Sequence, residues 1–197
     1  VITESIFSMD GDEAPLVAIC DAAADAGAWV LVDEAHAFGV AGPGGRGLAH
    51  DLACEGRIHA RMGALGKAAG AYGAFVAGSA ALAEYLRNRA RPYMYSTALP
   101  PGVASAALAG VGIITGEEGE RRRGRLAEIC VALRAALAAG GWPSAGGDGA
   151  IIPVVIGDAK RAMDLAARLQ ARGVLVRAIR HPSVPQGTER LRFVASA

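Results

Sequence analysis

Trp29-Val30-Leu31-Val32-Asp33-Glu34-Ala35-His36 is the stretch of sequence that decides the fold of this chain. Its first four residues are apolar, which is typical of a short strand buried in a parallel sheet with both faces covered. Val1-Ile2 predicts the end of an earlier strand, and residues 15–26 predict a helix that begins at a proline and ends before a glycine. Strand, helix and strand at this spacing form a βαβ unit. The sequence therefore predicts an α/β fold.

Further strands and helices follow along the chain. The expected strands are residues 58–62, 75–77, 151–156, 174–179 and 190–194, and residues 93–97 predict a short extended segment. The expected helices are residues 80–91, 103–115, 117–139 and 159–171. Residues 140–149 have the composition of a linker. Since the second half of the chain changes to a small α+β pattern, we expect a domain boundary near residue 119, with domains over residues 1–119 and 120–197.

Composition and charge argue against nucleic acid or a membrane as a partner and against a membrane-spanning segment. The 197 residues are 52% apolar with a net charge of +1, so a sizeable core is possible and neither nucleic acid nor a membrane is expected as a partner. The dense basic run from Arg121 to Arg125 follows three glutamates and predicts a solvated helix face. The longest uncharged stretch, residues 98–116, is too short after Pro100-Pro101 to span a bilayer, which needs about 20 apolar residues.

The cysteines indicate a reducing environment. Cys20, Cys54 and Cys130 are odd in number and lack the spacing of metal ligands, so no metal site is expected. Cys20 and Cys130 fall in apolar helical stretches and are expected to be core residues. With no signal peptide visible, the cytoplasm is the expected location. The chain begins and ends beside apolar runs, so we expect it to continue at both ends into a longer protein.

Lys67 and Asp33 form the pair of residues that most directly indicates chemistry. Lys67 lies 34 residues after Asp33, within the small-residue run Gly63-Ala64-Leu65-Gly66-Lys67-Ala68-Ala69-Gly70. Such neighbours allow a flat ligand to approach closely and leave room for desolvation, and a desolvated lysine is a better nucleophile. A lysine can form a Schiff base with pyridoxal phosphate, and an aspartate can keep the pyridinium nitrogen protonated. The pair therefore predicts a pyridoxal phosphate enzyme, with His36 close enough to contact the same ligand.

Each of these residues also has a structural interpretation when it is taken alone. An acid directly after a buried strand is often only a turn former or helix cap, so Asp33 alone leaves a structural and a functional role open. A lone histidine such as His36 is more often structural, and a lysine in a glycine-rich loop is more often a surface residue. The functional interpretation depends on the three occurring together.

Two nucleotide-binding interpretations are disfavoured. Asp33-Glu34-Ala35-His36 also spells a helicase Walker B box, but that box needs an upstream phosphate loop of the form G-x-x-x-x-G-K-[ST]. Here Gly66-Lys67 lies downstream and Ala68 follows it. Residues 42–47 match G-x-G-x-x-G, but Pro43 interrupts them and they do not join a strand to a long helix.

Six segments together resemble the α-oxoamine synthase family of fold-type I pyridoxal phosphate enzymes, which share the aminotransferase class I/II fold. They occur in the family's order and span essentially the whole chain. They are residues 7–12, 32–36, 45–47, 65–68, 95–101 and 178–185. The resemblance implies part of a large-domain mixed sheet with helices on both faces, followed by a small α+β carboxyl-terminal domain. The family's amino-terminal half, with its phosphate-binding turn and ring-stacking histidine, has no counterpart in these residues.

The resemblance also implies a role for each candidate site residue. Lys67 would hold the cofactor and later act as base on the amino acid's Cα proton, and Asp33 would pair with the pyridine nitrogen. Ser8 and His36 would contact the phenolic oxygen of the cofactor. Thr97 would reach the phosphate from the neighbouring subunit of a homodimer. Arg180 would hold the substrate carboxylate through a bidentate pair, with Ser183 beside it.

The reaction implied is a decarboxylative condensation of an amino acid with an acyl thioester. The residues at positions 95–101 and 180–185 most resemble the family member of biotin biosynthesis. That enzyme joins L-alanine to pimeloyl-CoA or a pimeloyl carrier protein. Another family member, using glycine or serine with an acyl-CoA, and a non-catalytic partial chain are the alternatives. Ala64 stands where the family usually has a threonine that bonds the phosphate, a loss of about 1.5–3 kcal/mol in cofactor binding.

Overall fold

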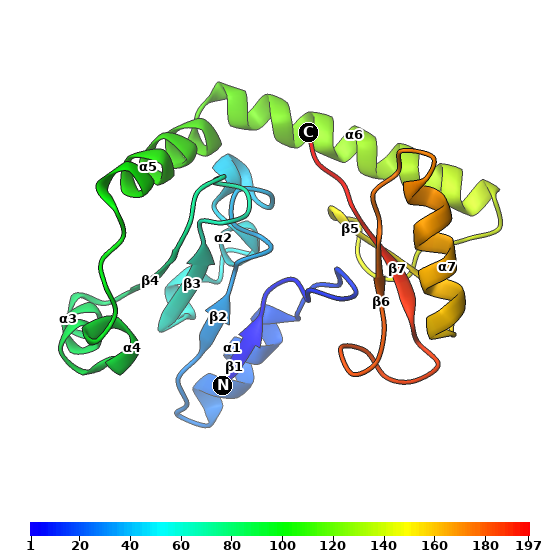
Figure 1. The fold of residues 1–197 in the computed structure, drawn as a ribbon. Helices are drawn as coiled ribbons and strands as arrows, with labels where there is room; N and C mark the ends of the chain where they lie inside the picture. Colours follow the sequence, from blue (N-terminus) through cyan, green and yellow to red (C-terminus); the bar gives the residue numbers. More distant parts are fainter. The chain divides into compact units, whose positions relative to one another are not determined.

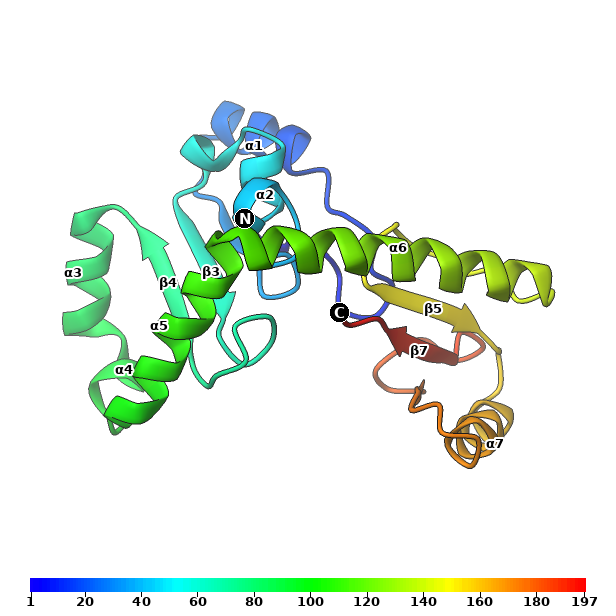
Figure 2. The same cartoon turned by 90° about the horizontal axis from the view of Figure 1, so that it is seen from above.

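The computed structural model describes residues 1–197, which form two compact units (Figures 1 and 2). Unit 1 consists of Val1–Ile6 and Ala14–Arg121, and unit 2 of Phe7–Glu13 and Arg122–Ala197. The assignment of residues 1–119 and 120–197 to a large and a small domain stays a prediction. The compact units are defined by contacts between residues, whereas the predicted domains are those of a protein family. The inclusion of Phe7–Glu13 in unit 2 is a feature that the sequence patterns did not indicate.

A mixed four-stranded sheet forms the centre of unit 1. Its strands are β1 (Ile2–Glu4), β2 (Leu31–Asp33), β3 (Ala60–Ala64) and β4 (Ala74–Gly78), in that order across the sheet. β1, β2 and β3 pair in parallel, and β4 pairs with β3 in the antiparallel direction. Val30 and Val32 are fully or almost fully buried, as expected for the middle of an α/β sheet.

Helices and short helical turns connect these strands or follow the last of them. They are α1 (Leu16–Asp25), η1 (Pro43–Gly45), α2 (Leu48–Asp51), η2 (Glu55–Arg57), α3 (Ala80–Arg89), α4 (Arg91–Met94) and α5 (Pro101–Thr115). The expected βαβ unit is present as β1, α1 and β2. α1 buries Leu16, Cys20 and Ala23 along one face.

The predicted extended segment over residues 93–97 is wrong in its first part, because Tyr93 and Met94 belong to α4. Pro92 lies in the first turn of this helix, where its missing N–H costs nothing and its fixed φ suits a helix. The N–H groups of Tyr93 and Met94 both donate to the carbonyl oxygen of Ala90, at 2.9 Å each. The local helical bonds therefore decide the conformation.

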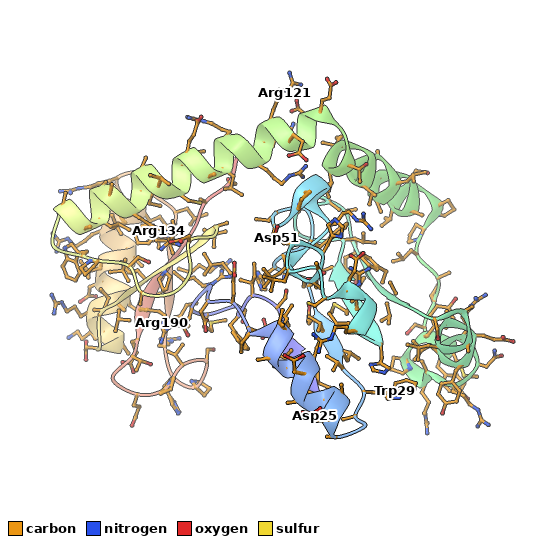
Figure 3. The ribbon with its side chains drawn as sticks, turned by 180° about the vertical axis from the view of Figure 1, so that it is seen from behind. Asp25, Trp29, Asp51, Arg121, Arg134 and Arg190 are labelled. Carbon is orange, nitrogen blue, oxygen red and sulfur yellow. The ribbon has the colours of Figure 1, made fainter.

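Two predicted strands are shorter than their apolar runs. β2 begins at Leu31 and includes Asp33, while Trp29, labelled in Figure 3, is 64% exposed. The Trp29 ring stacks on that of His59 with ring centroids 5.1 Å apart. β6 is limited to Arg177–Ile179, because Val174 still takes part in the helix end before it. Its N–H donates to the carbonyl oxygen of Leu169 at 3.0 Å.

Unit 2 is built on a small antiparallel sheet. Its strands are β5 (Ile151–Val155), β6 and β7 (Arg190–Val194), in the order β5-β7-β6. α7 (Ala159–Gln170) is capped at its N-terminus by Asp158, whose carboxylate accepts the N–H of Arg161 at 2.7 Å. The core of the unit consists of Val154, Val176 and Leu191, with half-buried apolar side chains from α7 packed against it. The expected small α+β arrangement is present.

The long helix α6 (Glu117–Ala139) has the predicted bounds and contains the division between the units. Arg121 and Arg125 are mostly exposed and each pairs with a glutamate of the same helix, as expected for a solvated face. Cys20, Cys54 and Cys130 are all buried and free, which confirms the expected core positions of Cys20 and Cys130. None of the helices combines the length and apolar character needed to cross a membrane.

The segment Phe7–Glu13 is held to the rest of unit 2 by an ion pair, a hydrogen bond and a close backbone approach. Arg190 of β7, labelled in Figure 3, is buried and pairs with the carboxylate of Asp10. The Nε of Arg192 donates to the carbonyl oxygen of Ser8 at 2.6 Å. A Cβ on Gly146 would lie 1.8 Å from the carbonyl oxygen of Asp10, so only glycine allows this approach. The loop that carries Ser8 is therefore fixed on β7.

Candidate active site

Asp33 and Lys67 lie at the same edge of the unit 1 sheet. Asp33 is the last residue of β2 and pairs with Met62 of the parallel strand β3. β3 ends at Ala64, and Lys67 follows in the turn that leads to β4. Since parallel strands end at the same edge, both residues are at the carboxyl ends of the strands, where ligands of α/β sheets bind.

The turn that carries Lys67 is closed by its own backbone. The N–H of Leu65 donates to the carbonyl oxygen of Gly73 at 2.9 Å, and the N–H of Ala71 donates to that of Leu65 at 2.9 Å. The N–H of Gly70 donates to the carbonyl oxygen of Lys67 at 3.0 Å. Lys67 itself is exposed. The turn is thus an ordered support for an accessible amine.

Asp33 is a turn former as well as a candidate ligand. Its Oδ1 accepts the N–H of Ala35 at 2.7 Å, the structural role that the sequence left open. A carboxylate has a second oxygen that can accept the N–H of a ligand. His36 is half-buried in the following helical turns, which begin where the N–H of Phe38 donates to the carbonyl oxygen of Glu34 at 2.7 Å. The structural role of Asp33 as a turn former and its candidate role as a ligand are therefore compatible.

Two glycines allow neighbouring segments to approach the Lys67 turn. A Cβ on Gly110 of α5 would lie 2.1 Å from the carbonyl oxygen of Ala69. A Cβ on Gly39, in the loop after His36, would lie 2.5 Å from the Cβ of Ala68. Sequence reasoning singled out the small residues around Lys67 but missed Gly110. A glycine inside an otherwise apolar helix was the signal that could have indicated it.

Phe75 covers the strand that leads into the Lys67 turn. Gly63 of β3 pairs with Phe75 of β4, and a Cβ on Gly63 would lie 2.4 Å from the Phe75 ring. Phe38, from the loop after His36, meets Phe75 edge to face with ring centroids 5.3 Å apart. The aromatic pair joins the His36 loop to β4 across the end of β3.

Glu34 is a buried acid that sequence reasoning did not select. Its side chain is 4% exposed, and its Oε1 accepts the N–H of Ala49 at 2.8 Å. A Cβ on Gly47 would lie 2.2 Å from Oε2, so glycine is needed there. Burial raises the pKa of Glu34, against the opposing effects of the backbone N–H of Ala49 and the charge of Arg61. Glu34 thus anchors the loop after β2 to α2.

The remaining candidate residues are carried by other segments of the two units. Thr97 is exposed in the connection between α4 and α5. In unit 2, Arg180 follows β6 and is exposed, and its Nη1 contacts the Sδ of Met163 at 2.9 Å. The N–H of Ser183 donates to the carbonyl oxygen of Arg180 at 3.0 Å, in a turn that contains the cis His181–Pro182 bond. The structure therefore brings Arg180 and Ser183 together.

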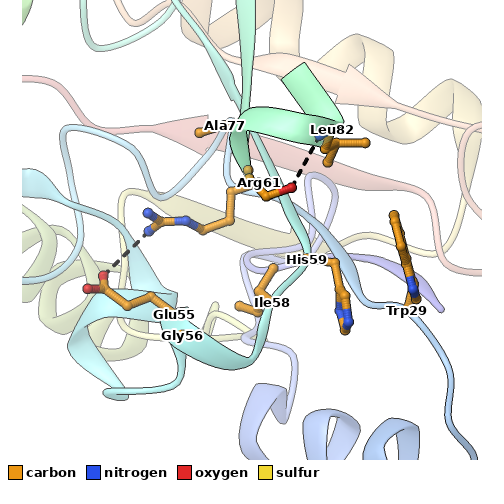
Figure 4. Close-up of a pocket in the computed structure, with 10 residues that line it drawn as sticks. Trp29, Glu55, Gly56, Ile58, His59, Arg61, Ala77 and Leu82 are labelled. Carbon is orange, nitrogen blue, oxygen red and sulfur yellow. Dashed lines mark hydrogen bonds and ion pairs between the residues drawn. The ribbon is translucent and has the colours of Figure 1, made fainter. Parts of the chain in front are cut away.

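A pocket of about 430 Å³ lies at the opposite end of β3 and contains none of the predicted site residues (Figure 4). The pocket lies beside the start of β3 at Ala60, whereas Lys67 follows the end of β3 at Ala64. Arg61 contacts the carboxylate of Glu55 at 3.5 Å in its wall. The pKa of Glu55 is lowered, chiefly by its hydrogen bond with His50. The residues that line it are Trp29, Glu55, Gly56, Ile58, His59, Arg61, Ala77, Gly78, Ser79 and Leu82.

The chain is similar to proteins of known type over its whole length. The family model described as aminotransferase class I and II matches residues 1–197. The 8-amino-7-oxononanoate synthase of Anaeromyxobacter dehalogenans (strain 2CP-C) is 51% identical over 197 residues, all of this chain and 49% of the relative. That of Cupriavidus metallidurans is 47% identical over 201 residues, all of this chain and 50% of the relative. The chain thus spans about half the length of the curated relatives it matches.

Solved structures share the fold. A structure of SPT with PLP as an internal aldimine has a TM-score of 0.93 at 34% identity, over 99% of this chain and 49% of that one. Serine palmitoyltransferase of Sphingomonas wittichii has a TM-score of 0.92 at 31% identity, over 98% and 49%. The 8-amino-7-oxononanoate synthase of Francisella tularensis has a TM-score of 0.82 at 30% identity, over 98% and 56%. These matches confirm the predicted fold-type I assignment.

Gly110→Ala is expected to destabilise the protein although alanine is the better helix former. In an unhindered helix interior the change would stabilise by about 1 kcal/mol, but here the Cβ would clash with the Ala69 carbonyl. Gly112→Ala, in the same helix with nothing within 4 Å of its Cβ, is the matched control and should raise stability. Urea unfolding of both variants measures the difference. Equal stabilisation by the two substitutions would show that α5 does not approach the Lys67 turn closely.

Glu34→Gln is expected to gain stability relative to the parent protein as the pH rises above 4.5, the ordinary pKa of a glutamate. A raised pKa in the folded state means that folding favours the protonated acid below this pH. The parent protein loses this stabilisation as the pH rises through the pKa of Glu34 in the folded state. Glutamine has no proton to lose, so the stability of the variant does not fall for this reason. Urea unfolding between about pH 4 and pH 7 measures the difference. Glu55→Gln is the control of opposite sign, because the pKa of Glu55 is lowered; parallel pH curves for parent and Glu34→Gln would contradict the prediction.

Proposed function

Because this chain belongs to the aminotransferase class I and II family, we propose that the protein acts as an 8-amino-7-oxononanoate synthase. It would condense L-alanine with pimeloyl-CoA or a pimeloyl carrier protein, with loss of carbon dioxide, in biotin biosynthesis. The observation that carries the proposal is the 51% identity to such a synthase over all 197 residues. The position of Asp33 and Lys67 at one sheet edge supports it.

We propose pyridoxal 5'-phosphate as the cofactor, and the unit 1 residues fit it. The second carboxylate oxygen of Asp33 is suited to hold a protonated pyridine nitrogen, and Lys67 presents an accessible amine on an ordered turn. Gly70, three residues after Lys67, has nothing within 4 Å of the position that a Cβ would take, which leaves open space beside the turn. When bound, the cofactor supplies an electron sink for the charge that develops at the amino acid's Cα. Ser8 and His36 are proposed to contact the cofactor as well.

The chain's own residues would then supply binding and proton transfer. Lys67 would take the proton from the amino acid's Cα and hold it at Nζ. Arg180 would bind the substrate carboxylate through both guanidinium nitrogens, with Ser183 in the same turn. Ala64, at the end of β3, supplies no hydroxyl for the phosphate. A related synthase that uses glycine or serine is the alternative, and the spectroscopic experiment below separates the amino acids.

We further propose a homodimer in the cytoplasm, in which Thr97 contributes to the phosphate site of the neighbouring subunit. Support comes from the apolar side chains around Thr97, of which Tyr93 is 65%, Tyr95 77% and Leu99 39% exposed. Exposed aromatic side chains in such a group are typical of a surface that another chain covers. Sedimentation of the purified protein at the mass of a single chain would contradict the dimer.

Adding pyridoxal phosphate to the purified protein is expected to give the visible absorption band of a lysine Schiff base. The chain has only two lysines, Lys67 and Lys160, so the source of the band can be decided. Lys67→Arg keeps the positive charge but cannot form an imine, and it should lose the band. Lys160→Arg is the matched control and should keep it. Alanine should change the band at lower concentration than glycine or serine does.

A band that survives in Lys67→Arg would refute the role of Lys67. A band that depends on Lys67 but responds best to glycine or serine would replace the proposed synthase with another member of the same group. Product analysis by mass spectrometry with alanine and pimeloyl-CoA then tests the acyl substrate.

Arg180→Lys is expected to raise the KM for alanine by about tenfold or more, with a smaller effect on kcat. Lysine keeps the charge but loses the bidentate geometry, and a charge-assisted hydrogen bond contributes about 1.5–3 kcal/mol. Arg177→Lys is the matched control, since Arg177 is exposed at the start of the same strand β6. Steady-state kinetics with varied alanine make the measurement. Similar KM values for the two variants would remove Arg180 from the substrate site.

A further inference from the structure

A pocket of about 580 Å³ in unit 2 contains none of the residues that the proposed function uses. It is lined by residues of α7 and its N-cap and by Trp142, which follows the end of α6 at Ala139. Its volume lies within the range of about 300–1,000 Å³ that is typical of sites for small molecules. Three cations and two acids stand opposite the indole: Lys160, Arg161, Arg168, Asp158 and Asp164. The pocket thus combines a charged helix with one aromatic ring.

The Trp142 ring is a preformed wall of this pocket. The backbone N–H of Trp142 donates to the carbonyl oxygen of Leu137 at 2.9 Å, which ties it to the end of α6. Arg134, labelled in Figure 3, holds the residues that follow. Its guanidinium donates to the Oγ of Ser144 and to the carbonyl oxygen of Gly149, at 2.9 Å each. Because Trp142 is still 38% exposed, its indole keeps apolar surface that a ligand can cover.

Three cationic side chains of α7 line this pocket without an ion pair. They are Lys160, Arg161 and Arg168, and none of them is paired with a carboxylate. The guanidinium carbon of Arg161 lies 5.6 Å from the centroid of the Trp142 ring, an attraction that holds the charge beside the ring. Arg161 and Arg168 are two helical turns apart, about 10 Å along α7. Cations spread over this length suit a ligand with more than one phosphate, since guanidinium groups pair well with phosphate oxygens.

The two aspartates of the pocket differ in their partners. Asp158 caps α7, whereas the Asp164 carboxylate has no hydrogen bond or ion pair within the chain. A carboxylate accepts hydrogen bonds, so the hydroxyl group of a ligand is a suitable partner. Acidic side chains bind ribose hydroxyls in this way in dinucleotide sites. A polyanion without a ring or hydroxyl groups would leave both Trp142 and Asp164 without a contact.

We propose that this pocket is a binding site for a nucleoside diphosphate. The base packs against Trp142, the ribose hydroxyls donate to Asp164, and the phosphates contact Arg161 and Arg168. Lys160 adds a third positive charge. Free nucleotides such as ADP and the nucleotide part of coenzyme A share this chemistry. The proposal does not rest on the synthase activity, because it uses none of the residues assigned to that activity.

Isothermal titration calorimetry of the purified protein with ADP tests the proposal. We expect one ADP to bind to each chain. Adenosine and inorganic pyrophosphate should each bind at least about tenfold more weakly, because each lacks part of the contacts. Coenzyme A is titrated in parallel: tighter binding than that of ADP identifies it as the source of the nucleotide, and equal or weaker binding identifies a free nucleotide. If neither compound binds at millimolar concentration, the proposal is wrong.

Variants of the pocket locate the bound ADP. Arg161→Gln and Arg168→Gln should each weaken ADP binding at least about tenfold, since each removes a charge-assisted contact with phosphate. Both side chains are exposed, so these changes leave the core of unit 2 intact. Trp142→Leu should weaken the binding of ADP but not that of pyrophosphate.

Arg172→Gln is the matched control, because Arg172 follows α7 and does not line the pocket. It should bind ADP as the parent protein does. ADP affinities that do not differ between Arg172→Gln and the two variants of the pocket arginines would overturn the proposal. Pyrophosphate binding as tight as that of ADP would do so too, because it would leave no contact for the base.

Discussion

The parallel pairing of β2 with β3 is the constraint on which the candidate site depends. Asp33 lies opposite Met62 in this pairing, and the chain then continues past Ala64 into the turn of Lys67. An antiparallel pairing would place the ends of the two strands at opposite edges of the sheet. A one-residue change in register would turn the Asp33 side chain to the other face. Both the choice of edge and the choice of face therefore come from backbone hydrogen bonds.

Close approach of backbones then fixes the Lys67 turn on that edge. Gly110 and Gly39 lack the Cβ atoms that would collide with Ala69 and Ala68. A turn packed in this way cannot carry large side chains near the lysine. Within the same turn, Gly70 has nothing within 4 Å of the position that a Cβ would take. The turn is thus closely packed at Ala68 and Ala69 and open beside Gly70.

The sequence predicted what short-range patterns determine and missed what distant contacts determine. Apolar runs gave the βαβ unit and most helices, and motif order gave the family. The helical conformation of Tyr93 was missed, because a proline next to it suits both a helix start and an extended segment. The inclusion of Phe7–Glu13 in unit 2 depends on Arg190, far along the chain. The contact of Gly110 with the Lys67 turn likewise has no local signal apart from a glycine in a helix.

Asp33 and Glu34 show how the end of one strand serves both stability and chemistry. Adjacent side chains at a strand end point to opposite sides. Asp33 is half-buried and uses one oxygen for the Ala35 N–H, which leaves the other for a ligand. Glu34 points into the protein, where burial favours its protonated form and the Ala49 N–H fixes it. One acid can remain available to a ligand because its neighbour anchors the loop that follows.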